Sequence, residues 1–303
     1  MKKFDVTGHE PSLVPDAHKW KLVWQDEFDG TELDRSKWGF RLDFWGKRMK
    51  TYTEEGVELD GNSHIKLHLL RKGDDFYSPY LQTGSLTFDH ASSDSGIWPF
   101  GPKEKPKFMH RYGFYEVRCR QPKNPGWHAA FWLQAPGVGS HPDPRYAGVE
   151  CDVMESYRLC SEGAIICGNL WDGYGADMKL TGGVMVPYVE TPDRWHTYAV
   201  DWQPTGYDFY FDGALVAKFI PDEKNRKRVA EESGLPEDRV RISPVSEVDQ
   251  FLLLSTECHG YRGAWFDVPP THKLGTPAEL LFKAELPDYF EADYVRVFDR
   301  CEE

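Results

Sequence analysis

Short alternating segments separated by turn residues dominate this sequence and constrain its fold more than any other feature. The clearest pair reads YDFYF, then Asp212-Gly213, then ALVAKF. An Asp-Gly pair between two such runs indicates a two-residue hairpin turn, because both turn residues must take a positive φ. We expect further strands at residues 21–24, 64–70, 113–119, 195–202, 251–258 and 294–298. Much of the chain is therefore predicted to form strands.

Helical segments are few, which narrows the fold class. One helix is predicted around residues 222–233, where Gly234 is placed to end it. Many short strands with Gly, Pro and Asp turns indicate an all-β sandwich or jelly roll. Residues 40–50 and 73–110 read as irregular stretches, and such loops often shape the binding sites of sandwiches.

Nothing in the sequence marks a boundary between domains. A length of 303 residues suits one large all-β domain or two smaller domains. The chain contains no repeat, no low-complexity segment and no Pro- or Ser-rich linker. We therefore expect a single domain over residues 1–303, with residues 1–17 as an extended N-terminal segment.

Composition excludes several classes of partner. A formal net charge of −13 argues against nucleic acid, whose binding depends on Lys and Arg neutralising phosphates. No apolar run is long enough for a membrane span. No apolar stretch follows the two lysines of the N-terminal MKKFDVTGHEP, so no signal peptide is visible. The protein is expected inside the cell, or outside it if a leader was removed.

One short segment, GVECDVMESY over residues 148–157, carries three closely spaced acids, Glu150, Asp152 and Glu155. On a helix the two glutamates would lie about 140° apart around the axis, on different faces. On a regular strand Glu150 and Asp152 would share a face, whereas Glu155 would point the other way. Neither regular structure brings the three carboxylates together.

A β-bulge at Val153-Met154 would bring the three carboxylates to one face of the strand. The extra residue returns Glu155 to the face of the other two acids, and Cys151 then faces the opposite, apolar side. Three acids side by side repel one another, so stability alone does not favour this arrangement. Retaining glycosidases, however, need two carboxyl groups about 5–5.5 Å apart. A solvated acidic strand and a cation site remain alternatives.

Several blocks of the sequence, in order, resemble glycoside hydrolase family 16, the laminarinase-like enzymes with a concanavalin-type β-sandwich jelly roll. The ECDVMES segment is similar to the bulged Glu-x-Asp-x-x-Glu signature of that family. The resemblance implies a concave substrate cleft, with Glu150 as nucleophile, Glu155 as acid/base and Asp152 as the residue that tunes both. It implies no cofactor for catalysis. The other similar blocks are residues 20–38, 51–67, 112–136, 195–213 and 292–298.

The same resemblance suggests residues that contact sugar. Tryptophans near the catalytic strand form the sugar platform in the family, which points to Trp127 and Trp132. Many relatives carry a His in a stretch like LHWDGYG, but this chain reads GNLWDGYG and lacks it. We expect Asn169 or Trp171 to take its place, with Trp171 as a plain core residue the alternative.

A structural calcium ion is a further implication of the resemblance. The matching positions are Glu27, the carbonyl of Gly61 and Asp293. Carboxylate and carbonyl oxygens suit Ca²⁺. An ion pair made by the same acids is the alternative.

Taken together, the three acids and the family resemblance imply an endo-acting retaining hydrolase of β-linked polysaccharide. The expected substrate is β-1,3-glucan or mixed-linkage β-1,3-1,4-glucan, cleaved by double displacement. A galactan hydrolase of the agarase, porphyranase or carrageenase type, a transglycosylase and a non-catalytic lectin-like domain are the alternatives. We expect a monomer whose partner is a polysaccharide or oligosaccharide.

Overall fold

The computed structural model describes most of the chain. The described residues are 1–44, 47–85, 105–138, 141, 143–157, 164–171, 179–187, 194–261 and 273–301. Much of the stretch at 73–110 that we predicted to border the binding site, together with part of 40–50, lies outside them.

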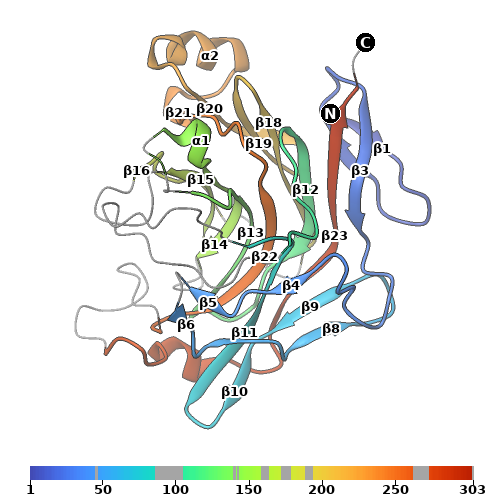
Figure 1. Ribbon diagram of the computed structural model, residues 1–303, viewed down its shortest axis with the longest axis vertical. Helices are drawn as coiled ribbons and strands as arrows, with labels where there is room; N and C mark the ends of the chain where they lie inside the picture. The colour runs from blue at the N-terminus through green and yellow to red at the C-terminus, as the bar shows by residue number, and fades with distance from the viewer. Residues whose placement is uncertain are drawn as a thin grey trace.

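Two large β-sheets form the body of the described chain (Figure 1). The first has ten strands in the order β10-β11-β22-β13-β14-β15-β16, with β17 beside β15 and both β4 and β7 beside β11. The central pairings are antiparallel, so neighbouring strands alternate in direction. Its strands are β4 (Gly39–Phe40), β7 (Tyr52–Thr53), β10 (Leu70–Lys72), β11 (Asp75–Gln82), β13 (Trp127–Gln134), β14 (Glu150–Tyr157), β15 (Ala164–Trp171), β16 (Lys179–Leu180), β17 (Val184–Pro187) and β22 (Phe251–Cys258).

The second sheet has nine strands within the described residues. Their order is β21-β20-β19-β18-β12-β23-β9-β8, and β3 pairs with β23. The strands are β3 (Trp20–Asp26), β8 (Val57–Leu59), β9 (Ile65–His68), β12 (Gly113–Arg120), β18 (His196–Gln203), β19 (Gly206–Phe211), β20 (Ala214–Ile220), β21 (Val240–Ile242) and β23 (Tyr289–Arg300).

Smaller elements complete the described chain. The first residues form a two-stranded sheet in place of a simple extended segment. No helix of the described residues is long and apolar enough to cross a membrane. The remaining elements are β1 (Lys2–Phe4), β2 (Ser12–Val14), β5 (Asp43–Phe44), β6 (Lys47–Arg48), α1 (Pro144–Ala147), α2 (Arg226–Ser233), η1 (Glu223–Asn225), η2 (Glu237–Arg239) and η3 (Glu279–Lys283).

The two large sheets share one apolar core. Phe131, Leu133 and Leu254 of the ten-stranded sheet belong to the same buried cluster as Val117 and Val295 of the nine-stranded sheet. Burying such side chains is the main favourable contribution to folding, about 1.5–3 kcal/mol for each one fully buried. The all-β sandwich expected from the strand and turn pattern is therefore confirmed.

Local turn chemistry agrees with the predicted hairpin and helix. Asp212 and Gly213 connect β19 and β20 with φ values of 47° and 76°. Positive φ at both central residues matches the twist of the flanking strands, so the hairpin closes without splaying. The predicted helix contains α2 and ends at Gly234, whose φ of 71° is left-handed.

One predicted loop is partly a strand. The stretch at 73–110 begins with β11, which pairs with β10, β22, β4 and β7. Its sequence, DFYSPYLQ, has no strict polar alternation, because all eight of its residues are buried or half-buried next to strands on both sides. Pro79 also argues against a central strand by sequence rules.

We predict that Gly113 cannot be replaced without a large loss of stability. Its φ of 99° is left-handed, and an added Cβ would collide with the carbonyl oxygen of Phe298 on β23. Gly113→Ala should lower the free energy of unfolding by about 2–4 kcal/mol in chemical denaturation. Gly234→Ala is the matched control, because Gly234 also has a positive φ but nothing within 4 Å of the added Cβ. For Gly234→Ala we expect a loss of roughly 1 kcal/mol in the free energy of unfolding. An equally small loss in Gly113→Ala would contradict the prediction.

Candidate active site

The predicted bulge is present in β14, an interior strand of the ten-stranded sheet between β13 and β15. Against β13, Phe131 pairs with Met154 and Trp132 pairs with Asp152, so Val153 is the extra residue. Against β15 the register also shifts between Asp152 and Glu155. An extra residue reverses the alternation of side chains beyond it.

The bulge places all three acids on one face of the sheet. In the register with β13, Glu150 lies opposite Gln134, and Glu155 lies opposite Ala130. We call the face that carries the acids the site face, and the opposite face lines the shared core. All three acids are half-buried.

Between the acids, the alternate residues of β14 point into the core. Cys151 and Met154 are fully buried, Val153 is 4% exposed, and all three belong to the core cluster. Two consecutive core residues, Val153 and Met154, mark the position of the extra residue. Core packing therefore holds the bulge, because straightening it would move an apolar side chain out of the core or an acid into it.

Asp152 lies between the two glutamates along the strand, and this position changes its acidity. Removal of water from around the carboxyl group raises its pKa well above the ordinary range, and the neighbouring charges of Glu155 and Glu150 raise it further. Both causes disfavour the charged form of a carboxyl group. Both effects favour the protonated form of Asp152.

A chain of hydrogen bonds fixes Glu150 from the side of β13. The amide nitrogen of Gln134 donates to Oε2 of Glu150 at 2.8 Å. The guanidinium Nη1 of Arg41 donates to Oε1 of Gln134 at 3.2 Å. Arginine can only donate and a carboxylate can only accept, so the Gln134 amide has a single orientation that satisfies both partners.

Arg41 and Gln134 are buried and were not predicted as site residues. Arg41 is 5% exposed and Gln134 is fully buried. The guanidinium of Arg41 lies 5.6 Å from the ring centroid of Trp132 and 5.4 Å from that of Tyr80. Strand alternation in FWLQ could have identified Gln134, which shares the face of Trp132. No local pattern connects Arg41 with this site.

Of the two tryptophans predicted as sugar platforms, the structure places one on the site face. Trp132 lies opposite Asp152, is 7% exposed, and donates its indole N–H to Oγ of Ser255 at 3.0 Å. Trp127 is fully buried in a separate apolar cluster and donates to Oδ2 of Asp288. The structure corrects the prediction for Trp127, which packs as a core residue and offers no ring face to a sugar.

The two candidates for the missing His lie on β15. Asn169 is opposite Cys151, is 2% exposed, and donates to Oγ of Ser243 at 2.8 Å. This position beside a core residue corrects the predicted sugar contact of Asn169. Trp171 is half-buried at the end of β15, opposite Lys179 of β16. Its contact with sugar stays a prediction.

The acids predicted to bind calcium are paired with arginines. Both carboxylate oxygens of Glu27 accept from Arg296, from Nε and Nη2 at 2.7 Å each. Asp293 forms an ion pair with Arg118. Both oxygens of Glu27 are thus occupied by Arg296, whereas Asp293 is paired through Oδ2, and calcium at these positions stays a prediction. The structure shows Glu27 and Asp293 in the ion pairs that we gave as the alternative.

We predict that Glu27 is needed for stability because of its buried partner. Arg296 is fully buried, so Glu27→Gln would leave its charge without the carboxylate to which it is hydrogen-bonded. Breaking a buried ion pair by removing one partner costs about 3–5 kcal/mol in the free energy of unfolding. Glu232→Gln, which breaks the exposed pair with Arg228, is the control and should change stability by less than about 1 kcal/mol. Equal losses in the two variants would argue against the prediction.

The chain matches a known family by sequence. The model of the family described as glycosyl hydrolases family 16 matches residues 45–242. The glucan endo-1,3-beta-glucosidase A1 of Niallia circulans is 27% identical over 213 residues, which are 65% of this chain and 29% of that protein. The beta-glucanase of Rhodothermus marinus is 25% identical over 298 residues, which are 93% of this chain and 86% of that protein. The chain thus spans less than a third of one relative and most of the other.

Solved structures show the same fold. The catalytic domain of an endo-1,3-beta-glucanase (laminarinase) from Thermotoga petrophila superimposes with a TM-score of 0.62 at 21% identity. The alignment covers 94% of this chain and all of that domain. The jelly-roll sandwich expected from the resemblance is therefore confirmed.

Proposed function

The chain belongs to glycosyl hydrolases family 16, and on that premise we propose that it is an endo-acting, retaining β-glucanase. Its proposed substrate is β-1,3-glucan or mixed-linkage β-1,3-1,4-glucan. The observation that carries the proposal is the bulged strand β14, which brings Glu150, Asp152 and Glu155 to one face of the sheet. The glucanase names of the two sequence relatives support the choice of substrate.

The proposed reaction proceeds in two displacements. Glu150 attacks the anomeric carbon and forms an ester with the sugar, while Glu155 gives its proton to the leaving glycosidic oxygen. Glu155 then removes a proton from water, whose oxygen attacks the same carbon and releases Glu150 as a carboxylate. The two inversions return the original configuration. No step uses a cofactor.

The neighbours of Glu150 support its role as nucleophile. Its Oε2 accepts a hydrogen bond from Gln134, which orients the carboxylate on the site face. A protonated Asp152 can donate a hydrogen bond to either glutamate, and its neutral form adds no charge beside them. Trp132 on the same face is the proposed sugar platform.

We also propose that the described chain acts as one domain and as a monomer. The two large sheets share one core, which supports a single folding unit. The galactan hydrolase and transglycosylase alternatives keep the same three acids and differ in the sugar or acceptor. A panel of polysaccharides would show whether glucan or galactan is cleaved. Product sizes with an added oligosaccharide acceptor would show whether sugar is transferred to the acceptor or to water.

Replacing either catalytic glutamate should abolish turnover. Glu150→Ser removes the nucleophile and Glu155→Gln removes the acid/base, so each should lower kcat on laminarin by about 10³-fold or more. New reducing ends measure the rate. Glu231→Gln, an exposed acid on α2, is the control and should keep full activity. Unchanged turnover in either glutamate variant would overturn the assignment. Binding without cleavage by the unmodified protein would favour the lectin alternative.

Gln134 should contribute to rate by positioning Glu150. Gln134→Met keeps the volume but removes the donor, and a hydrogen bond to a charged group contributes about 1.5–3 kcal/mol. We therefore expect kcat to fall roughly 10- to 100-fold with a much smaller change in KM. Leu133→Met, a similar change on the core face of the same strand, should leave kcat near that of the unmodified protein. Equal kcat values in the two variants would exclude a positioning role.

A further inference from the structure

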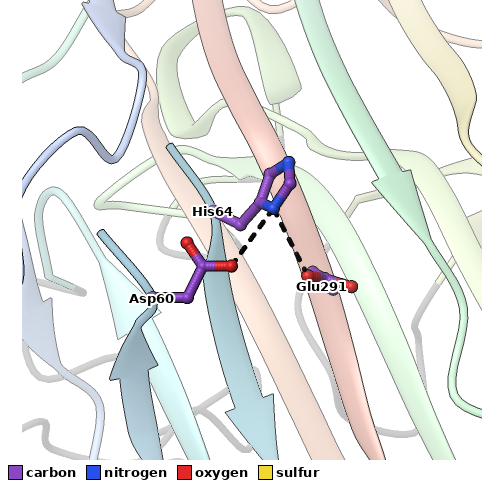
Figure 2. A group of neighbouring side chains, drawn as sticks. All are labelled: Asp60, His64 and Glu291. Atoms are coloured by element: carbon purple, nitrogen blue, oxygen red, sulfur yellow. Dashed lines mark hydrogen bonds and ion pairs between the residues drawn. The ribbon is translucent and has the colours of Figure 1, made fainter. Parts of the chain in front are cut away.

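A group of three metal-ligating side chains lies on the nine-stranded sheet, which does not carry the proposed catalytic acids. Asp60 follows β8, His64 precedes β9, and Glu291 belongs to β23. Figure 2 shows both carboxylates directed at the same imidazole nitrogen of His64. These residues played no part in the predicted calcium site, which used other acids.

The spacing of the three atoms is close to that of a metal site. Nδ1 of His64 lies 3.3 Å from Oδ2 of Asp60 and 3.6 Å from Oε1 of Glu291. The three atoms all lie within 4.8 Å of one another. Zinc with bonds of about 2.0–2.1 Å in tetrahedral geometry separates its ligand atoms by about 3.4 Å. Only small side-chain movements would therefore place three ligands around one ion.

Each carboxylate has its other oxygen held by a separate donor. The backbone N–H of Asn62 donates to Oδ1 of Asp60 at 2.8 Å. Nε of Arg120 donates to Oε2 of Glu291. Metal-binding carboxylates are commonly oriented in this way, with one oxygen on the metal and the other hydrogen-bonded to the protein. The arrangement leaves Oδ2 and Oε1 directed towards His64.

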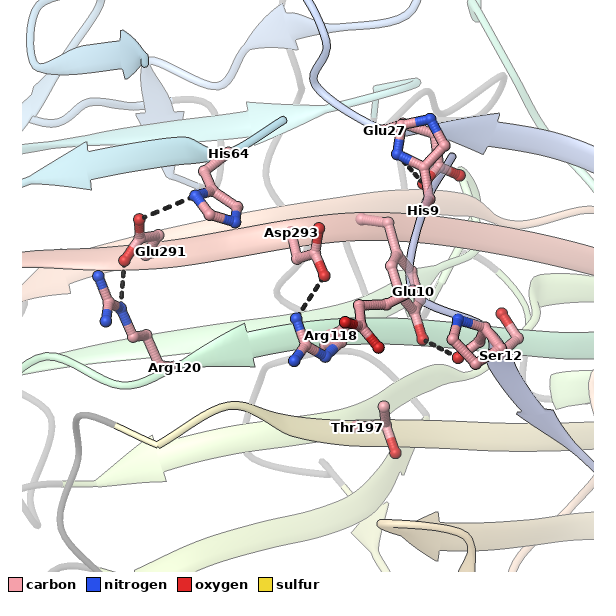
Figure 3. A network of polar contacts seen from close by, with 12 residues as sticks. His9, Glu10, Ser12, Glu27, His64, Arg118, Arg120, Thr197, Glu291 and Asp293 are labelled. Atoms are coloured by element: carbon pink, nitrogen blue, oxygen red, sulfur yellow. Dashed lines mark hydrogen bonds and ion pairs between the residues drawn. The ribbon is translucent and has the colours of Figure 1, made fainter. Parts of the chain in front are cut away.

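The His64 ring is also held in place. Its centroid lies 4.9 Å from that of Trp195, and the guanidinium groups of Arg118 and Arg120 lie 4.9 and 5.1 Å from the Trp195 ring. Figure 3 shows His64, which precedes β9, and Arg120 of β12 approaching Glu291 from opposite sides of β23. The imidazole therefore has a defined orientation before any ion binds.

Burial and charge at the group allow an ion to enter. The Glu291 side chain is 1% exposed, whereas those of Asp60 and His64 are 17% and 29% exposed, so the group opens to solvent on one side. Lys66 lies 3.7 Å from Oδ2 of Asp60, but it is closer to Glu58, at 3.2 Å. The four acids Glu58, Asp60, Glu291 and Asp293 outnumber the three nearby cations, Lys66, Arg118 and Arg120.

We propose that Asp60, His64 and Glu291 bind a divalent transition-metal ion of the zinc class, with water as the fourth ligand. An imidazole ligand favours zinc, copper or nickel over calcium, which prefers oxygen ligands alone. The ion joins the turn between β8 and β9 to β23, which stabilises this edge of the nine-stranded sheet. The proposal is independent of the proposed glucanase function.

Zinc titration of the whole protein tests this proposal. The protein is first treated with EDTA and desalted, and zinc binding is then followed by isothermal titration and by the shift of Tm. We expect one site that is lost in His64→Ala and weakened at least tenfold in Glu291→Gln. Cobalt in place of zinc should give the visible absorption of a four-coordinate ion in the unmodified protein.

His68→Ala is the matched control for the histidine variant. His68 lies on β9 and pairs with Glu58 at 2.8 Å, without belonging to the group of three. It should retain the zinc site and the zinc-dependent rise in Tm. Circular dichroism checks that each variant is folded, and His64→Ala alone decides the matter if Glu291→Gln fails to fold. Absence of binding to the unmodified protein, or equal binding by His64→Ala, would overturn the proposal.

Discussion

The extra residue in β14 is the constraint on which the proposed site depends. Strand side chains alternate between two faces, so acids separated by five positions cannot share a face on a regular strand. The bulge reverses the alternation between Asp152 and Glu155 and leaves pairing with β13 and β15 intact on both sides. Because both neighbours hold the strand, the three carboxylates cannot move apart to relieve their repulsion.

The core explains how this arrangement of like charges is tolerated. The residues between the acids, Cys151, Val153 and Met154, are buried in the cluster that both sheets share. Their burial opposes any register slip that would separate the acids, since a slip would expose apolar surface. Proton uptake by Asp152, whose pKa is raised by burial and by its neighbours, lowers the repulsion further. The chemistry on one face thus depends on packing on the other.

Several acidic side chains on the nine-stranded sheet have basic side chains as partners. Several of its buried acids pair with arginines, as Glu27 does with Arg296 and Asp293 does with Arg118. Such pairs satisfy the charges locally and leave few carboxylate oxygens for other ligands. The group around His64 differs because each of its acids keeps one oxygen directed at an imidazole. This contrast separates the zinc proposal from the predicted calcium site.

The sequence by itself determined the sandwich, the hairpin at Asp212-Gly213 and the need for a bulge between Asp152 and Glu155, because each follows from local periodicity and turn chemistry. It could not decide which face of a strand meets the core. That choice depends on contacts between segments far apart in the chain. The resemblance therefore suggests sugar contacts for Trp127 and Asn169, although both lie on the face opposite the acids. For the same reason only the tertiary structure showed Arg41 behind Gln134 and Glu291 beside His64. Arg41 and Gln134 are 93 residues apart in the chain, and no local sequence pattern can indicate a contact between residues so far apart.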